Sequence, residues 1–298
     1  MRIILSGASG LVGSWLQPDL EADGIDVLRL VRSDEEAEAH DAARWDPSAG
    51  ILDPALLAGA DAVVNLNGRN IAGSRWTESE KQLLRSSRLD STTTLVRAVA
   101  DADPPPKVLV SASATGYFGD RGEEILDESS SPGDGFLADL ARDWEQAALA
   151  AHGAGIRVVA VRFGMIVARG GALAKMLLPF KLGLGGPIGS GRQWWPWVAI
   201  EDVLGVIRFV IDRTDIDGAV NVVSPHQVRC REFTSTLGSV LHRPAVLPAP
   251  AFAVRLALGE MADALLLAST RVQPARLEEL GYRFLAPRLD DAIRRALD

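Results

Sequence analysis

The amino-acid sequence predicts an α/β fold: a doubly wound parallel sheet followed by a smaller, mainly helical C-terminal part. Short, almost wholly apolar segments alternate with helical stretches, which is typical of a parallel sheet covered by helices on both faces. A glycine-rich loop also joins the first apolar segment to the first helical one. With right-handed crossovers, such a sheet has its ligand crevice at the carboxyl ends of its strands.

The expected strands and helices follow one another in a regular order. We expect strands at residues 1–6, 26–31, 62–66, 107–111 and 157–161, and helices from 11 to about 22, at 77–100 and at 135–151. From about Pro179 the chain becomes rich in glycine and tryptophan, which indicates a long loop. Residues 229–298 are predicted to be mostly helical. They include an amphipathic helix at 253–267 that either closes over the cleft or forms a dimer surface.

The glycine loop predicts a nucleotide site of the Rossmann type. Gly7 permits a tight turn off the strand, Gly10 lets the backbone approach a pyrophosphate, and Gly13 lets the helix pack close to the sheet. The start of the helix offers free N–H groups and a positive dipole end to a phosphate. The alternative is a glycine turn without a ligand. The loop residues assigned to the cofactor are Gly7, Ser9, Gly10, Leu11, Val12 and Gly13.

The end of the second strand bears on the choice between NAD and NADP. An acidic residue there would bind the ribose 2′-hydroxyl and repel a 2′-phosphate. This chain has Arg32, which can hold a phosphate by a bidentate contact, and Ser33, which can donate a further hydrogen bond. NADP is therefore the expected cofactor. Asp34 lies close enough to leave NAD open, and the alternative for Arg32 is a surface arginine without a ligand.

Composition excludes several other classes of protein. The single cysteine, Cys230, allows no internal disulfide, and four scattered histidines lack the spacing of metal ligands. A net charge of −8 argues against a nucleic-acid partner. No apolar stretch reaches the length of a membrane span, and no segment has the pattern of a signal peptide. We expect a cytoplasmic protein, monomeric or homodimeric, that takes a small-molecule substrate and no metal.

Several segments resemble the extended short-chain dehydrogenase/reductases, the superfamily of sugar-nucleotide epimerases and dehydratases. Asn65-Leu66-Asn67-Gly68 is similar to the superfamily's Asn-Ala-Gly segment, with Asn67 in place of alanine. Ser111-Ala112-Ser113-Ala114-Thr115-Gly116-Tyr117 is similar to its active-site serine strand. The resemblance implies cofactor contacts from Leu66, Asn67, Gly68 and Ser111, and from Phe163, Gly164 and Met165 at the end of a later strand.

A closer resemblance is to an atypical subfamily labelled epimerase-like. Its marks in this chain are residues 75–77, 87–88, 143–145 and 183–194, with a C-terminal domain of unknown function marked by 248–252 and 258–261. The resemblance implies two domains. Residues 1–225 would bind NADP, and residues 226–298 would complete the substrate side.

One feature of the superfamily is missing. Its hydride chemistry uses a Tyr-x-x-x-Lys pair, in which the lysine tunes the tyrosine for proton exchange. At the matching place this chain has Phe136 and Leu140, which fall on one helix face with Trp144. That face is therefore expected to be apolar.

Other side chains are candidates for the chemistry and the pocket. Ser113 matches the serine that usually bonds the substrate carbonyl, and Tyr117 is a candidate acid, the alternative being an ordinary pocket tyrosine. Asp202 is expected to cap the helix that follows Ile200. The expected substrate pocket contains one cation and three indoles, unless the tryptophans only pack the C-terminal part. These four residues are Arg192, Trp194, Trp195 and Trp197.

Two functional interpretations follow from the sequence. The first is an NADP-dependent oxidoreductase or epimerase-like enzyme with a displaced acid–base group. The second is a sensor or regulatory protein that binds NADP(H) without turnover. The intact glycine loop is compatible with both, and the missing Tyr-x-x-x-Lys pair favours the second or an altered mechanism.

Overall fold

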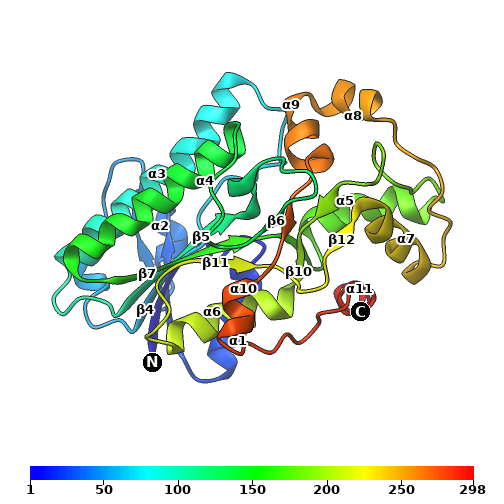
Figure 1. The fold of residues 1–298 in the computed structure, drawn as a ribbon. Helices are drawn as coiled ribbons and strands as arrows, with labels where there is room; N and C mark the ends of the chain where they lie inside the picture. Colours follow the sequence, from blue (N-terminus) through cyan, green and yellow to red (C-terminus); the bar gives the residue numbers. More distant parts are fainter.

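The computed structural model describes residues 1–298 and contains the predicted parallel sheet (Figure 1). Seven strands lie in the order β11-β7-β5-β4-β1-β2-β3, and all neighbours run parallel. The order reverses beside β1, so the crevice for a ligand lies at the carboxyl ends of β1 and β4. The strands are β1 (Arg2–Ser6), β2 (Asp26–Val31), β3 (Ala42–Arg44), β4 (Ala62–Asn65), β5 (Val108–Ala114), β7 (Arg157–Phe163) and β11 (Gly218–Val222).

Helices cover both faces of this sheet. α1 (Gly13–Ala22) and α6 (Ile200–Asp212) pack on one face, and α3 (Glu78–Asp101) and α4 (Phe136–Leu149) on the other (Figure 1). Alternate strand residues enter the two cores, because successive side chains point to opposite faces: Leu5 lies in the α1 and α6 core, and Ile4 in the α3 and α4 core. No helix combines the length and apolar character that a bilayer crossing requires.

The element ends differ from the sequence expectations at three places. α1 begins at Gly13 rather than Leu11, because residues 7–12 form the loop. β5 and β7 continue beyond the expected ends, to Ala114 and Phe163. The added residues include the polar side chains of Ser113 and Arg162, which interrupt the apolar pattern and are nevertheless buried. The apolar pattern therefore predicts the middle of β5 and β7 but not their C-terminal residues, where the polar side chains lie.

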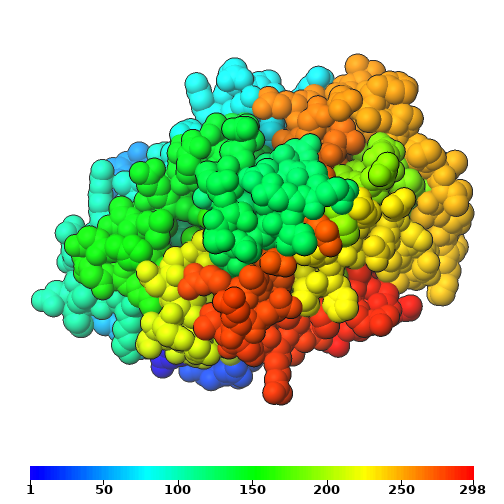
Figure 2. Space-filling model, in the orientation of Figure 1, coloured from blue at the N-terminus to red at the C-terminus, as the bar shows by residue number.

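Two strands of the C-terminal part pair with strands that lie before the predicted boundary at residue 225. β12 (Val228–Arg229) pairs with β9 (Trp194–Trp195), and β13 (Arg271–Val272) pairs with β6 (Ile125–Leu126). In Figure 2 the orange residues around β13 lie against the green segment that contains β6. One core joins residues from both sides of the predicted boundary at 225. Its elements are β8 (Met165–Val167), α5 (Gly171–Lys181), β10 (Trp197–Ala199), α7 (Cys230–Val240) and α11 (Leu289–Leu297).

The predicted helix at 253–267 is wrong as a single element. It is divided at Gly259, whose φ of 64° and ψ of −142° no helix adopts. The parts are α8 (Ala251–Leu258), α9 (Glu260–Ala262) and a π-helical turn at Asp263–Leu267. Likewise, the loop expected from Pro179 begins later, because Pro179 lies within α5.

The prediction that Asp202 caps a helix is also wrong. Ala199 occupies the N-cap of α6, and Asp202 lies within its first turn, almost completely buried. The carboxylate of Asp202 accepts backbone N–H groups of Leu285 at 2.6 Å and Ala286 at 3.1 Å. Burial raises the pKa of this carboxyl group. Asp202 therefore binds the C-terminal segment to α6 through these two hydrogen bonds and does not cap the helix.

Candidate functional site

The glycine loop has the close contacts that its sequence predicts. Gly7 has a φ of +80°, and a Cβ there would lie 2.7 Å from the backbone carbon of Leu66. A Cβ on Gly13 would lie 2.2 Å from the carbonyl oxygen of Gly7. The turn is closed by the N–H of Gly10, which donates to the same oxygen at 3.0 Å. Only glycine is tolerated at positions 7 and 13, because a side chain would strike backbone in both places.

The start of α1 leaves backbone donors free. Its N-cap residue, Val12, has no polar side chain to satisfy them. The N–H groups of Leu11, Val12 and Gly13 donate to no acceptor in the protein. Ser9 lies exposed at the tip of the loop, so its hydroxyl is accessible. Unpaired N–H groups at a helix start attract phosphate oxygens, which fits the predicted pyrophosphate site.

A polar cavity of about 330 Å³ opens at the carboxyl ends of β2 and β4. We call it the coenzyme pocket. It brings together Arg32 at the end of β2 with Asn67 and Gly68 after β4, as the sequence predicted for cofactor residues. The side-chain nitrogen of Asn67 is buried and has no hydrogen-bond partner, so it lacks an acceptor that a ligand could supply.

One wall of the coenzyme pocket was not predicted. It consists of polar side chains on α3 spaced one helical turn apart, together with the loop after β3. The polar i, i+4 spacing on α3 was the signal available in the sequence. These residues are Pro47, Ser48, Ser86, Ser87, Asp90 and Ser91.

The two residues predicted to select NADP differ in their contacts. Arg32 is exposed, borders the coenzyme pocket and has no carboxylate partner among the ion pairs of the structure. The hydroxyl of Ser33 instead caps α2 (Asp34–Ala37): it accepts the N–H of Glu36 and donates to the carboxylate of that residue at 3.0 Å. Arg32 is therefore available to an anion, whereas the Ser33 proton is already used.

A buried ion pair lies at the carboxyl edge of the sheet. Arg162 donates to both carboxylate oxygens of Glu145 at 2.7 and 2.8 Å, and the Ser113 hydroxyl donates to one of them at 2.6 Å. Tyr117 covers the guanidinium, whose carbon lies 3.6 Å from the ring centroid. We call these four residues the Arg162 cluster. The two predicted catalytic residues therefore contact the same ion pair: Ser113 contacts its carboxylate and Tyr117 contacts its guanidinium.

Two polar groups of the Arg162 cluster remain without a partner. Arg162 is only 3% exposed, and its Nη1 is buried and donates to no acceptor in the protein. The hydroxyl of half-buried Tyr117 makes no hydrogen bond to the protein. A buried donor without an acceptor costs about 1–3 kcal/mol. An oxygen atom from a ligand or a water molecule would satisfy it.

The face of α4 next to the serine strand differs from the expected one. Phe136 contacts Trp76 on the opposite side, with ring centroids 5.1 Å apart, and the indole N–H of Trp144 donates to Thr92 of α3. The face toward the serine strand carries Leu137, which meets Gly116, and Glu145. The predicted face of Phe136, Leu140 and Trp144 is apolar, with Leu140 and Trp144 only 3% and 6% exposed, whereas Glu145 lies on a separate face of the helix. α4 nevertheless contains no tyrosine and no lysine.

The remaining predicted cofactor residues surround this edge. Ser111 is buried and accepts a hydrogen bond from Asn65 at 3.4 Å. Phe163 and Met165 are half-buried where β7 ends. A Cβ on Gly164 between them would lie 2.9 Å from the Pro196 backbone, so glycine is needed for β8 to pair with β10.

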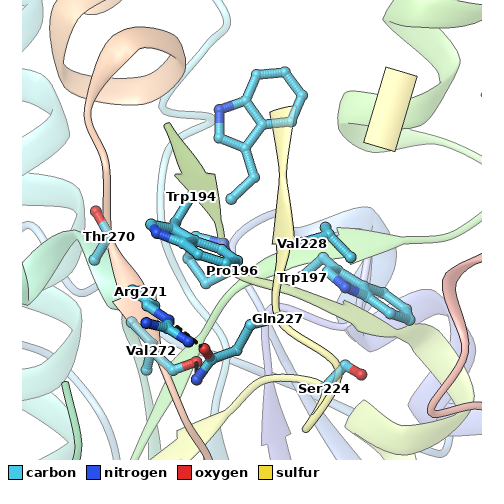
Figure 3. Close-up of a pocket in the computed structure, with 10 residues that line it drawn as sticks. Trp194, Pro196, Trp197, Ser224, Gln227, Val228, Thr270, Arg271 and Val272 are labelled. Atoms are coloured by element: carbon cyan, nitrogen blue, oxygen red, sulfur yellow. Dashed lines mark hydrogen bonds between the residues drawn. The ribbon is translucent and has the colours of Figure 1, made fainter. Parts of the chain in front are cut away.

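Two of the three tryptophans of the expected substrate pocket are buried in packing contacts. Figure 3 shows Trp194 and Trp197 among the residues around a small pocket. Trp195 and Trp197 are 6% and 1% exposed, and their indole N–H groups donate to the carbonyls of Leu266 and His226. The pocket between these residues has a volume of about 10 Å³, which leaves room for about one water molecule. These two indoles therefore stabilise the C-terminal part and offer almost no surface to a ligand.

Trp194 is more accessible and lies between two cations. The guanidinium carbons of Arg229 and Arg271 are 4.3 and 4.5 Å from its ring. Its indole N–H donates to Glu123, which also pairs with Arg229. Hydrogen bonds from Arg229 and Trp194 lower the pKa of Glu123 to about 2. The side chain of Arg192 is exposed, and only the backbone carbonyl of this residue takes part, because it accepts a hydrogen bond from Arg229.

Comparison with known proteins agrees with this architecture. Residues 3–223 match the NAD dependent epimerase/dehydratase family, and residues 249–296 match a domain of unknown function (DUF1731). The chain is 41% identical over 294 residues to the epimerase family protein Mb2239 of Mycobacterium bovis, covering 98% of this chain and 96% of the relative. It is 36% identical to the epimerase family protein SDR39U1 of Homo sapiens, covering 99% of both.

A solved structure extends the comparison to three dimensions. The crystal structure of human SDR39U1 (isoform 2) with NADPH superimposes with a TM-score of 0.90 at 34% identity, covering 99% of each chain. The match includes the glycine loop, the sheet and the C-terminal helices, since it spans almost every residue. On sequence and structure together, this chain belongs to the NAD dependent epimerase/dehydratase family.

Proposed function

We propose that this protein binds NADP(H) and acts as an oxidoreductase or epimerase-like enzyme on a small molecule with a hydroxyl or carbonyl group. The observation that carries the proposal is the Arg162 cluster, which holds a tyrosine hydroxyl without a protein partner at the carboxyl edge of the sheet. NADPH is the ligand in the structure of the human relative, which supports the choice of coenzyme.

The residues of this chain fit a dinucleotide. Glycine at positions 7 and 13 lets the loop pack closely on the backbone around it, and three N–H groups remain for phosphate oxygens. Asn67 offers an unused donor inside the coenzyme pocket, next to Arg32. The chemistry that a bound nicotinamide coenzyme supplies is hydride transfer.

In this proposal Tyr117 exchanges a proton with the substrate oxygen. The guanidinium of Arg162 stabilises negative charge on the phenol, and Glu145 fixes the guanidinium by two hydrogen bonds. Ser113 is a positioning residue, because its proton is committed to Glu145. Nη1 of Arg162 donates to the same substrate oxygen or to a water beside it.

A non-catalytic role as an NADP(H) sensor is the second candidate. It is favoured by α4, which presents neither tyrosine nor lysine. Anaerobic mixing of the reduced protein–coenzyme complex with carbonyl compounds and sugar nucleotides distinguishes the two. Loss of the reduced nicotinamide absorbance supports the enzyme, whereas tight binding with no oxidation by any compound supports the sensor.

The Tyr117→Phe variant tests the proposed acid. With a substrate found in that panel, we expect turnover to fall by roughly 10²–10⁴, the usual contribution of a general acid–base group. The affinity for NADPH should not change, because the ring still covers Arg162. Steady-state kinetics and a coenzyme titration measure the two effects. Unchanged turnover would remove Tyr117 from the mechanism.

Arg32→Ala tests the choice of coenzyme. Removing a charged hydrogen bond of about 1.5–3 kcal/mol should weaken NADPH binding by roughly 10- to 150-fold and leave NADH binding nearly unchanged. Titrations followed by nicotinamide fluorescence give both dissociation constants. Equal affinities of the unmodified protein for NADPH and NADH would contradict the assignment of Arg32.

A further inference from the structure

The predicted site for the 2′-phosphate lies beside a run of acidic residues. Asp34, Glu35, Glu36 and Glu38 follow Arg32 almost directly, on and after α2. A phosphate monoester carries a charge of about −1.5 to −2 near neutral pH. Unscreened carboxylates within a few ångströms would oppose its binding. Arg32 alone supplies one positive charge, so another group must counter the nearest carboxylate.

Arg44 is placed to do so. It ends β3, where its backbone pairs with Val31 of β2, directly before Arg32. Its Nη1 pairs with the carboxylate of Asp34. Its Nε donates to the backbone carbonyl of Arg32 at 2.9 Å. One side chain therefore neutralises the nearest acid and holds the backbone from which Arg32 projects.

We propose that Arg44 is a specificity-determining residue for NADP(H), acting through Asp34 and the backbone of Arg32. The inference rests on the proposed binding of NADP(H). With Arg44 present, the charges of Arg32, Arg44 and Asp34 sum to +1 (two cations and one anion). Without Arg44 they sum to zero, and Asp34 faces the phosphate without a counter-charge. NADH lacks the 2′-phosphate and is insensitive to this change.

Glu36 has a different partner from Asp34. The carboxylate of Glu36 accepts a hydrogen bond from the hydroxyl of Ser33, at the start of its own short helix.

The ion pair of Arg44 and Asp34 is accessible to salt. The Asp34 side chain is 87% exposed and that of Arg44 is 45% exposed, so the pair borders solvent and salt screens it. The contribution of Arg44 to NADPH binding should therefore diminish as the ionic strength rises.

A double-mutant cycle tests the inference. We expect Arg44→Ala to weaken NADPH binding about tenfold, which corresponds to about 1.4 kcal/mol, and to change NADH binding less than about twofold. Asp34→Asn should leave NADPH binding equal or slightly tighter. The double variant, Arg44→Ala with Asp34→Asn, should recover most of the lost affinity, because the charge that Arg44 counters is gone. Coenzyme titrations at low and high salt give all values.

One further variant separates the two roles of Arg44, and a second variant is a control at another exposed ion pair. Arg44→Gln removes the charge and keeps a donor for the Arg32 carbonyl, so an affinity between those of Arg44→Ala and the unmodified protein is expected. Arg295→Ala is the matched control, since Arg295 forms a similarly exposed pair with Asp291 on α11. It should leave both affinities unchanged. Circular dichroism confirms that each variant is folded.

Each outcome has a defined meaning. If the unmodified protein binds neither coenzyme, the proposed function fails and the inference fails with it. If it binds NADPH and Arg44→Ala does not weaken this binding, or weakens NADH binding equally, the inference alone is overturned. A double variant as weak as Arg44→Ala overturns the role of Asp34, because the loss then does not depend on that carboxylate.

Discussion

Replacing Gly10 with valine is expected to abolish binding of NADPH while the protein still folds. A Cβ at this position meets only the carbonyl oxygen of Gly7, at 3.2 Å, and Gly10 does not have a positive φ. The backbone can therefore accept the substitution with a small shift. The valine methyl groups would then occupy the space above the free N–H groups at the start of α1. We expect a loss of affinity beyond about 100-fold, since phosphate contacts dominate this end of the ligand.

Gly13→Ala is the informative comparison for that variant. Its Cβ would lie 2.2 Å from the Gly7 oxygen and 2.7 Å from the Cα of Ala8, so the loop or α1 must move. Thermal unfolding should show a large loss of stability for Gly13→Ala and a small one for Gly10→Val. A folded Gly10→Val protein with normal NADPH affinity would show that the loop is not the phosphate site.

The Glu145→Ala variant should lose about 3–5 kcal/mol of unfolding free energy, the usual cost of leaving one partner of a buried ion pair unpaired. The side chains of Arg162 and Glu145 are only 4% and 8% exposed. Removing the carboxylate leaves the guanidinium without its two hydrogen bonds and the Ser113 hydroxyl without its acceptor. Urea unfolding measures the loss.

Two controls make this result specific. Asp291→Ala removes the acid of an exposed pair on α11 and should cost far less, because water solvates the arginine that remains. Glu145→Leu combined with Arg162→Met removes both charges and should recover much of the stability lost by the single variant. A Glu145→Ala protein as stable as the Asp291→Ala protein would contradict the buried character of the pair.

The fold could be predicted from the sequence wherever local pattern determines structure. The apolar runs of β1, β2 and β4 and the glycine loop depend on residues adjacent in the chain. β5 and β7 were predicted too short because Ser113 and Arg162 look like surface residues; only the contact with Glu145, from a separate helix, permits their burial. The apolar residues around Gly259 predict one continuous helix, but the backbone of Gly259 divides it. Hydrophobic periodicity carries no information on the φ of a glycine, so this break could not be predicted.

The candidate site, like the fold, could be predicted only where its residues belong to a local sequence pattern. Gly7, Gly13 and Arg32 could be predicted as cofactor residues because a motif fixes their spacing along the chain. The proposed role of Arg44 could not be predicted, because this residue lies on a strand of three residues, β3, that no sequence pattern indicates. The tryptophans of residues 194–197 were expected around a ligand, yet the burial of Trp195 and Trp197 depends on β12 and on the carbonyl of Leu266. Long-range contacts of this kind require the structure.

The pairing of β13 with β6 has a consequence for synthesis of the chain. Residues 271–272 complete an element begun at 125–126, and α11, at 289–297, closes the core that contains Trp197. During translation the earlier residues leave the ribosome first, at about 5–20 residues per second. Several seconds therefore pass in which the glycine loop and the main sheet have emerged while the apolar side chains around β10 lack their cover. A nascent chain in that interval presents a hydrophobic surface for chaperones, and a ribosome stalled near residue 270 would keep it exposed.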